Sequence, residues 1–187
     1  MLRSSRKITT LWPSRIPNEE YATRRDNLMK TLKKETKIGE KQVVIVMKGA
    51  RKSFIAPDVP HAFRQKSHFR YINGITSPDC YYLLQSGTTS STSNSILFAD
   101  RRSAYDELWE GKLPSESDWE ATAKFSEIVP TNRLLQTLEK VCDKSTAVFF
   151  DSASDDLLHK FLQVKAASVR ELNHFASINA QKRIFKA

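Results

Sequence analysis

The residues of this chain that could do chemistry are few and lie far apart. His61 and His68 are seven positions from each other, and Asp58 is the only acid close to them. Metal sites normally take ligands at tight-turn or helical spacing with a third ligand nearby, so this pair does not predict one. Asp155 and Asp156 are adjacent, but consecutive helical residues point about 100° apart and do not converge on one ion. They are better explained as acids in the first turn of a helix, where the helix dipole stabilises them.

Sequence motifs with a known chemistry are absent. The chain contains no HExxH, GxSxG, Walker or GxGxxG pattern, and none of its five glycines is next to another. A phosphate-binding loop is therefore not predicted. His159 and His174 are expected at the surface of helices. We expect no catalytic residue and no metal ligand in this chain.

The most informative stretch runs from Asp58 to Asp79, DVPHAFRQKSHFRYINGITSPD. A loop bounded by prolines leads to Phe63-Arg64-Gln65, an aromatic ring and two strong hydrogen-bonding groups in the kind of segment where binding residues concentrate. The alternation of Phe69 and Tyr71 predicts that both lie on one face of a strand. The candidate residues of a cleft or interface are thus Asp58, Phe63, Arg64, Gln65, Phe69 and Tyr71. The alternative, which we favour, is that Phe63 fills the core and Arg64 ties down the loop.

Composition indicates one ordinary globular domain. The 187 residues are 40% hydrophobic and 27% charged, and no apolar run is long enough to cross a membrane. Cys80 and Cys142 stand alone, which predicts free thiols and not a disulfide scaffold.

The net charge of +9 comes entirely from the first 70 residues, whose own net charge is +11. Residues 1–17 contain basic, Ser and Thr residues and no acid, the composition of a mitochondrial transit segment. A disordered basic tail is the alternative, and a cytoplasmic location would accompany it. The basic residues of the following helix surround much of its axis, which argues against a nucleic-acid-binding face.

The pattern of apolar and turn residues predicts alternating helices and strands. Helices are expected at 18–37, 104–109, from 117 onward, 131–141, 154–164 and 168–185. Strands are expected at 42–47, 68–72, 80–85, 95–99, 128–129 and 147–150, and a loop is expected around Pro57 and Pro60. This order favours an α/β domain with a mixed β-sheet flanked by helices.

Three ordered motifs resemble the N-terminal domain of the aminopeptidase P family. The first is Asp58-Val-Pro60 through Pro78-Asp79, which is similar to the pattern DxPYxFRQxSxFxYLxGxxEPD. The second is Tyr21-Ala-x-Arg24-Arg25, similar to the opening helix, and the third is Glu107-Leu108-Trp109-x-Gly111, similar to the ELWxG turn. Within the family, the mitochondrial Xaa-Pro aminopeptidase and intermediate-cleaving peptidase group is the most similar.

The resemblance implies a creatinase/prolidase N-terminal-like fold over residues 18–187. In that family a C-terminal pita-bread domain holds two manganese or other divalent ions through two Asp, one His and two Glu, and it cleaves peptides before proline. None of those ligands can be assigned to a residue of this sequence. Lys66, Ile75-Thr76-Ser77 and Lys112-Leu113-Pro114 depart from the family pattern.

Two functions are therefore expected. The first is the non-catalytic N-terminal part of a manganese-dependent aminopeptidase, inactive alone and lacking the catalytic domain. The second is an interaction or regulatory module that forms homo- or hetero-oligomers with a related aminopeptidase. A basic protein that binds nucleic acid is the least favoured alternative. The partners that we expect therefore include neither nucleic acid nor a membrane.

Overall fold

A computed structural model describes residues 16–36, 41–57, 59–87, 93–151 and 155–172. The first element is the long helix α1 (Asn18–Thr36), with acids in its first turn and lysines in its last, as the helix dipole favours. Tyr21, Leu28 and Leu32 recur at helical spacing on its buried side. The helix predicted at 18–37 is thereby confirmed.

A six-stranded sheet forms the centre of the domain, in the order β6-β5-β4-β1-β7-β8. The strand β1 pairs antiparallel with β4, which pairs antiparallel with β5; the other three pairings, β1–β7, β7–β8 and β5–β6, are parallel. The strands are β1 (Val43–Lys48), β4 (Tyr81–Gln85), β5 (Asn94–Phe98), β6 (Glu127–Val129), β7 (Ala147–Phe150) and β8 (Ser168–Glu171). The mixed sheet confirms the predicted α/β class.

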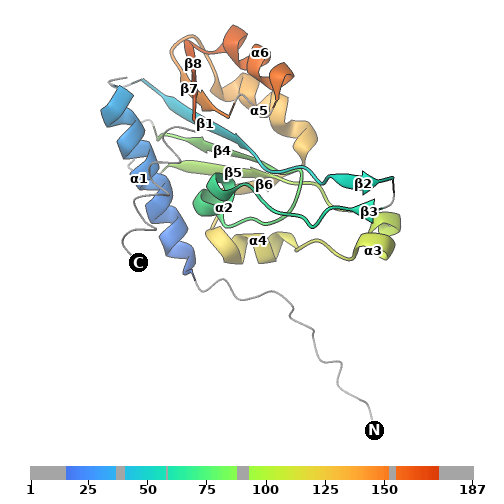
Figure 1. The fold of residues 1–187 in the computed structure, drawn as a ribbon. Coiled ribbons are helices and arrows are strands. Elements are labelled where there is room, and N and C mark those ends of the chain that lie inside the picture. Colours follow the sequence, from blue (N-terminus) through green and yellow to red (C-terminus); the bar gives the residue numbers. More distant parts are fainter. Residues whose placement is uncertain (1–15, 37–40, 58, 88–92, 152–154, 173–187) are drawn as a thin grey trace.

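Helices cover both faces of this sheet (Figure 1). Alternate residues of β1 point to opposite faces, so Ile45 joins one apolar cluster and Val44 the other. The first cluster is completed by α1, α2 (Ser67–Asn73) and α4 (Glu116–Ala123), and the second by α5 (Leu134–Val141) and α6 (Asp156–Lys165). Every residue of β1 is buried, as the apolar run Val43–Met47 favours, and only its last residue, Lys48, is charged.

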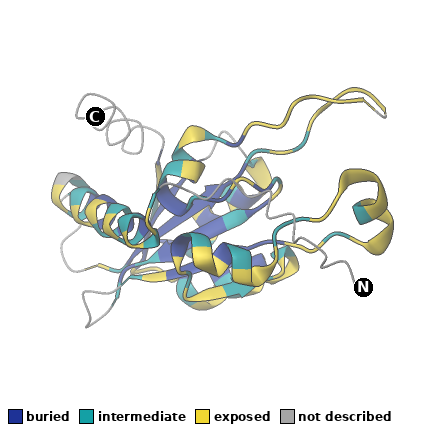
Figure 2. Cartoon of the chain, turned by 90° about the horizontal axis from the view of Figure 1, so that it is seen from below, coloured by how far each residue is buried: buried dark blue, intermediate teal, exposed yellow. Residues whose placement is uncertain are grey.

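Two segments project from one end of the sheet (Figures 1 and 2). One is the arm, which we define as residues 51–57 and 59–63. It contains the two-stranded pairing of β2 (Phe54–Ala56) with β3 (Val59–Pro60). The other is the short helix α3 (Ala104–Glu110). The loop predicted around Pro57 and Pro60 therefore includes a small hairpin, and the helix predicted at 104–109 is confirmed.

The strand predicted at 68–72 is wrong, because these residues form α2. Gly74 ends this helix in the left-handed conformation, with φ of 73°, and its N–H donates to the carbonyl of Arg70. A Cβ at Gly74 would lie 2.8 Å from both Tyr21 Cζ and Thr122 Cγ2, so only glycine fits where α1, α2 and α4 meet. The conformation and the close approach both require this residue.

The helix predicted at 168–185 is also wrong in its first part. Residues 168–171 form β8, paired in parallel with β7 from Ala147 to Phe150. The remainder of that prediction lies outside the described residues, as does His174. The helix predicted at 131–141 begins with a 3₁₀ turn, Thr131–Arg133, before α5. The other predicted strands match β1, β4, β5, β6 and β7 within one or two residues.

Candidate functional site

Gln65 is an internal brace. Its side chain is buried, its Oε1 accepts from the backbone N–H of Ala50 at 2.6 Å, and its Nε2 donates to the carbonyl of Ser77 at 2.8 Å. The same Oε1 accepts from the N–H of Lys66 at 2.9 Å. One amide side chain thus joins the end of β1 to the loop before β4, a structural role that needs both its donor and its acceptor.

Phe69 and Tyr71 do not share a strand face as predicted. They lie two residues apart on α2, where Phe69 is buried in the first core cluster. Tyr71 is half-buried and packs under the guanidinium of Arg24, which lies 4.3 Å from the ring centroid and donates to the Tyr71 carbonyl at 2.9 Å. These two residues therefore secure α2 to the sheet and to α1.

Phe63 lies at the end of the arm, and Arg64 follows it. The prediction that Phe63 fills the core is wrong, because 37% of its surface is exposed. Arg64 is exposed as well, and Asp58 lies outside the described residues. The five candidates that the structure describes thus divide into internal braces (Gln65, Phe69 and Tyr71) and an exposed pair (Phe63 and Arg64).

The paired arginines of the opening helix are also braces. Arg25 is buried and donates from both terminal guanidinium nitrogens, Nη1 and Nη2, to the carbonyl of Ala123, and from Nη2 to the carbonyl of Lys124. Its neighbour Arg24 contacts Tyr71, as described above. The Tyr-Ala-x-Arg-Arg motif therefore fixes α1 to α2 and to the end of α4.

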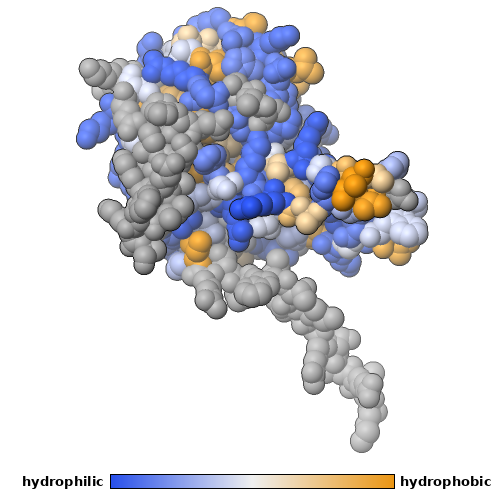
Figure 3. Space-filling model, in the orientation of Figure 1, coloured by the Kyte–Doolittle hydropathy of each residue, from blue (hydrophilic) through white to orange (hydrophobic). Residues whose placement is uncertain are grey.

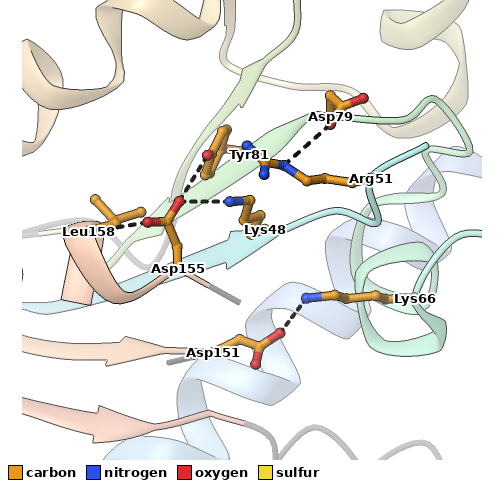
Figure 4. A network of polar contacts seen from close by, with 8 residues as sticks. All are labelled: Lys48, Arg51, Lys66, Asp79, Tyr81, Asp151, Asp155 and Leu158. Atoms are coloured by element: carbon orange, nitrogen blue, oxygen red, sulfur yellow. Dashed lines mark hydrogen bonds and ion pairs between the residues drawn. The ribbon is translucent and has the colours of Figure 1, made fainter. Parts of the chain in front are cut away.

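Polar side chains gather at the carboxyl end of β1 and β7 (Figure 4). The ammonium of Lys48 lies 2.7 Å from Oδ2 of Asp155, which also accepts from the hydroxyl of Tyr81 at 3.2 Å. Oδ1 of Asp155 caps α6 by accepting from the N–H of Leu158. The prediction of acids in the first turn of a helix is thereby sharpened, since Asp155 is the cap and Asp156 is the first helical residue.

These contacts oppose the effect of burial on both charges. Burial alone would raise the pKa of Asp155, but the hydrogen bonds from Lys48, Leu158 and Tyr81 outweigh it and lower that pKa. Burial alone would lower the pKa of Lys48, and its bonds to Asp155 and Tyr81 raise it instead. The network therefore keeps an ion pair charged between β1, β4 and α6.

Lys66, one of the departures from the family pattern, has a partner at the same edge. Its ammonium lies 2.8 Å from Oδ2 of Asp151, directly after β7 (Figure 4). The pair joins the start of α2 to the far half of the sheet. Because 85 residues separate the two, no local signal in the sequence could have found it.

The sequence-based candidates for metal binding that the structure describes do not form a metal site. His61 is exposed in the arm, and His68 is on α2. Across the part of the chain that the structure describes, no three His, Cys, Asp or Glu side chains group closely enough to hold a metal ion. Cys80 and Cys142 are free and buried, as predicted. Burial, above all, raises their pKa values to about 12 and about 11, so neither is an activated nucleophile.

The most unusual surface lies at the projecting end. Seven of the ten large hydrophobic residues that the structure describes as exposed are here, although such residues are usually scattered singly. We call them the distal surface: Phe54, Ile55, Val59 and Phe63 in the arm, and Tyr105, Leu108 and Trp109 on α3. Figure 3 shows hydrophobic side chains gathered at this end. Sequence reasoning missed this surface, although the i, i+3, i+4 spacing on α3 was a usable signal.

A cavity of about 370 Å³ lies between the base of the arm and α3. Phe54, Pro78 and Leu113 contribute apolar walls. Charged residues of both signs complete the lining: Lys52, Arg101, Arg102, Asp79, Asp100, Asp106 and Glu110. The projecting end therefore combines exposed apolar side chains with a hollow.

Ion pairs tie the two projecting segments together at their bases. Glu110, the last residue of α3, lies 2.5 Å from the ammonium of Lys52 and 2.8 Å from the guanidinium of Arg102. Arg102 also donates to the backbone carbonyls of Glu110 and Gly111, at 3.0 and 2.7 Å. We call this group the Glu110 clamp.

By its fold, the protein is a three-layer α/β domain with a mixed six-stranded sheet and a projecting arm. The sequence profile described as "Aminopeptidase P, N-terminal domain" matches residues 21–149, more than half of the chain. The chain belongs to this family.

Curated relatives agree. Human Xaa-Pro aminopeptidase 3 is 26% identical over 179 residues, which cover 90% of this chain and 35% of the relative. Human Xaa-Pro dipeptidase is 29% identical over 102 residues, covering 54% of this chain and 20% of the relative. The chain thus spans about a third of the length of the Xaa-Pro aminopeptidase 3 proteins that it matches.

Solved structures show the same fold. Aminopeptidase PepP from Pseudomonas aeruginosa superposes with a TM-score of 0.70 at 22% identity, covering 87% of this chain and 38% of that one. Escherichia coli aminopeptidase P gives 0.69 at 18% identity, covering 84% and 37%. None of the helices in the described part of the chain is long and apolar enough to cross a membrane.

Proposed function

We propose that this chain acts as the N-terminal domain of an Xaa-Pro aminopeptidase and that it supplies a surface for assembly. The observation that carries the proposal is the distal surface, where Ile55, Leu108 and Trp109 are between 67% and 77% exposed. Exposed apolar side chains of this size favour contact with another protein. The family supports a partner that is itself a peptidase subunit.

The partner that fits best is a second copy of the same chain. A two-fold interface uses the same patch on both subunits, so the patch must carry both protruding and receiving features. The distal surface provides the protruding side chains, and the cavity beside it provides the receiving feature. The cavity lining carries both signs of charge, so the surface would not repel a copy of itself as a surface of one sign would.

Sedimentation velocity over a range of concentrations tests this assembly. We expect a concentration-dependent dimer that Leu108→Asp abolishes, because the carboxylate would be desolvated in the contact. Leu157→Asp is the matched control, since Leu157 is 80% exposed on α6, away from the arm. A chain that stays monomeric and does not bind a related full-length aminopeptidase would contradict the proposal. Pairing with that relative alone would favour the regulatory-module function.

We make a separate proposal about peptide hydrolysis, which is that the chain alone does not catalyse it. The described residues do not fit the manganese-binding set that the family resemblance implies, because they contain no group able to hold a metal ion. We therefore assign them no step in peptide cleavage and expect the chain alone to be inactive on Xaa-Pro peptides. Purified chain with manganese and an Xaa-Pro peptide should give no turnover. Turnover that a chelator abolishes would overturn this expectation.

A mitochondrial location is proposed from residues 1–17, of which 1–15 lie outside the described part of the chain. Their basic, acid-free composition supports it. Fusing these residues to a fluorescent protein should direct it to mitochondria, and replacing Arg3, Arg6 and Lys7 by Gln should prevent import. Cytoplasmic fluorescence of the unaltered fusion would contradict the proposal.

A further inference from the structure

We infer that Glu110 is a positioning residue whose ion pairs hold the arm and α3 in a fixed relation, so that the distal surface is formed before a partner arrives. The inference rests on the proposed assembly function and adds to it the element that controls the surface. Lys52 and Arg102 are the other members of this clamp.

Core packing fixes neither projecting segment. None of the residues of α3 is buried, and every residue of β2 and β3 is exposed. Apolar packing is what normally fixes the angle of a helix on a domain. The orientation of α3 relative to the arm must therefore come from polar contacts at the bases of the two segments.

The Glu110 clamp joins the base of the arm to the last turn of α3. Lys52 bridges the segments, because its ammonium contacts Glu110 and also lies 5.3 Å from the ring centroid of Phe54 in the arm. Arg102 binds the side chain and backbone of Glu110 and the carbonyl of Gly111, and so fixes the last turn of α3. Lys52 approaches Oε1 of Glu110 and Arg102 approaches Oε2, so the one carboxylate binds both cations at the same time.

The ion pairs of the clamp are partly shielded from water. The side chains of Lys52 and Arg102 are 21% and 17% exposed, and that of Glu110 is 32% exposed. Elsewhere, the Lys165–Glu139 pair is 40% and 53% exposed at 3.3 Å, typical of surface pairs with little effect. Water therefore screens the clamp less than it screens that pair.

The consequence concerns binding more than folding. A surface made of two loosely connected segments loses conformational freedom when it binds, and a preformed one does not. Replacing Glu110 should leave the core intact but let α3 and the arm move independently. The expected result is weaker association at almost unchanged thermal stability.

A distance measurement on the free domain tests the clamp without any partner. Spin labels are placed at Ile55→Cys and Leu108→Cys, and the native cysteines stay unlabelled because both are buried. We expect a narrow distance distribution that Glu110→Gln broadens and that Lys52→Met broadens independently. Glu139→Gln is the matched control and should leave it narrow. A distribution that is broad at the start, or that neither clamp variant changes, would overturn the inference.

The same variants, without labels, are then compared by sedimentation. Glu110→Gln should weaken dimer formation about fivefold, with Glu110→Asp retaining part of the affinity and Glu139→Gln all of it. Broadened distances with unchanged affinity would overturn the role of the clamp in assembly. If no association occurs in any form while the distances still respond, the proposed function fails and the clamp is upheld as a conformational element.

Discussion

The strand β1 and the arm are built from similar residues and have opposite environments. The run Val43–Lys48 is buried along its whole length, whereas Phe54, Ile55 and Val59 are about half exposed or more. The difference lies in their partners, since β1 has strands on both sides and helices on both faces, and the arm has only its own two strands. Apolar sequence in the first region therefore stabilises the fold, and in the second it is available for contact.

The largest difference between the two regions is expected from a pair of matched isoleucine substitutions. Ile45 is fully buried in β1 and Ile55 is 67% exposed in the arm. We expect Ile45→Ala to lower the free energy of unfolding by about 4 kcal/mol, because it leaves a cavity. Ile55→Ala should change it by less than about 0.5 kcal/mol and weaken association instead. Urea unfolding measures both, and equal losses of stability would contradict the contrast.

The next test separates the two halves of the Arg64-Gln65 motif. Gln65→Leu removes the partners of the Ala50 N–H and the Ser77 carbonyl and should destabilise the domain by about 3 kcal/mol. Arg64→Leu, one residue away and exposed, should have almost no effect on the same unfolding curve. If Arg64→Leu were the more damaging change, the assignment of Gln65 as the internal brace would be wrong.

A smaller, pH-dependent effect is expected at Asp155. Its pKa is lower in the folded chain than in the unfolded chain, so the ion pair with Lys48 stabilises the fold fully above the ordinary carboxyl pKa of about 4 and is lost as the pH falls through the folded value. Asp155→Asn should therefore lower stability by about 2 kcal/mol at pH 7 and by progressively less below pH 4. Unfolding curves of both proteins, recorded from pH 7 to pH 3, measure how the difference in their free energies of unfolding shrinks. A constant difference across that range would argue against the pair.

The smallest effect is expected at the two thiols. Burial, as the main cause, holds the pKa of Cys80 at about 12 and that of Cys142 at about 11, so both should be inert to a thiol reagent at pH 8. Both should react in denaturant. A cysteine placed at Ile55 supplies the exposed reference and should react at once in the folded protein. Rapid modification of either native thiol would show that its core cluster opens.

The same contrast explains what could be predicted from the sequence. Strands β1 and β7 were found because their unbroken apolar runs match burial on both faces of a sheet. The helix α2 was missed because Phe69 and Tyr71 also fit strand alternation in so short a segment. Asn73-Gly74 was the available signal for a helix end. The strand β8 was missed because it forms by pairing with β7. That pairing depends on the folded sheet and leaves no pattern in the local sequence of β8.

For the site, motif residues were found but their roles were not. Arg24, Arg25 and Gln65 appear in motifs that the sequence makes visible, yet the contacts that join them to other elements span 12 to 99 residues. Such contacts follow from the finished fold and have no local pattern. The contact between Lys52 and Glu110 in the clamp is also long-range and has no local pattern. The contact between Arg102 and Glu110 spans only eight residues of the chain.

The position of β1 between β4 and β7 has a consequence for synthesis of the chain. Its antiparallel neighbour β4 follows within about 40 residues, but its parallel neighbour β7 follows only about 100 residues later. At typical translation rates β1 leaves the ribosome on the order of ten seconds before β7 does. During that interval one edge of β1, which is apolar from Val43 to Met47, is open to other chains. We therefore expect an aggregation-prone stage of synthesis that ends once β7 has left the ribosome and paired with β1.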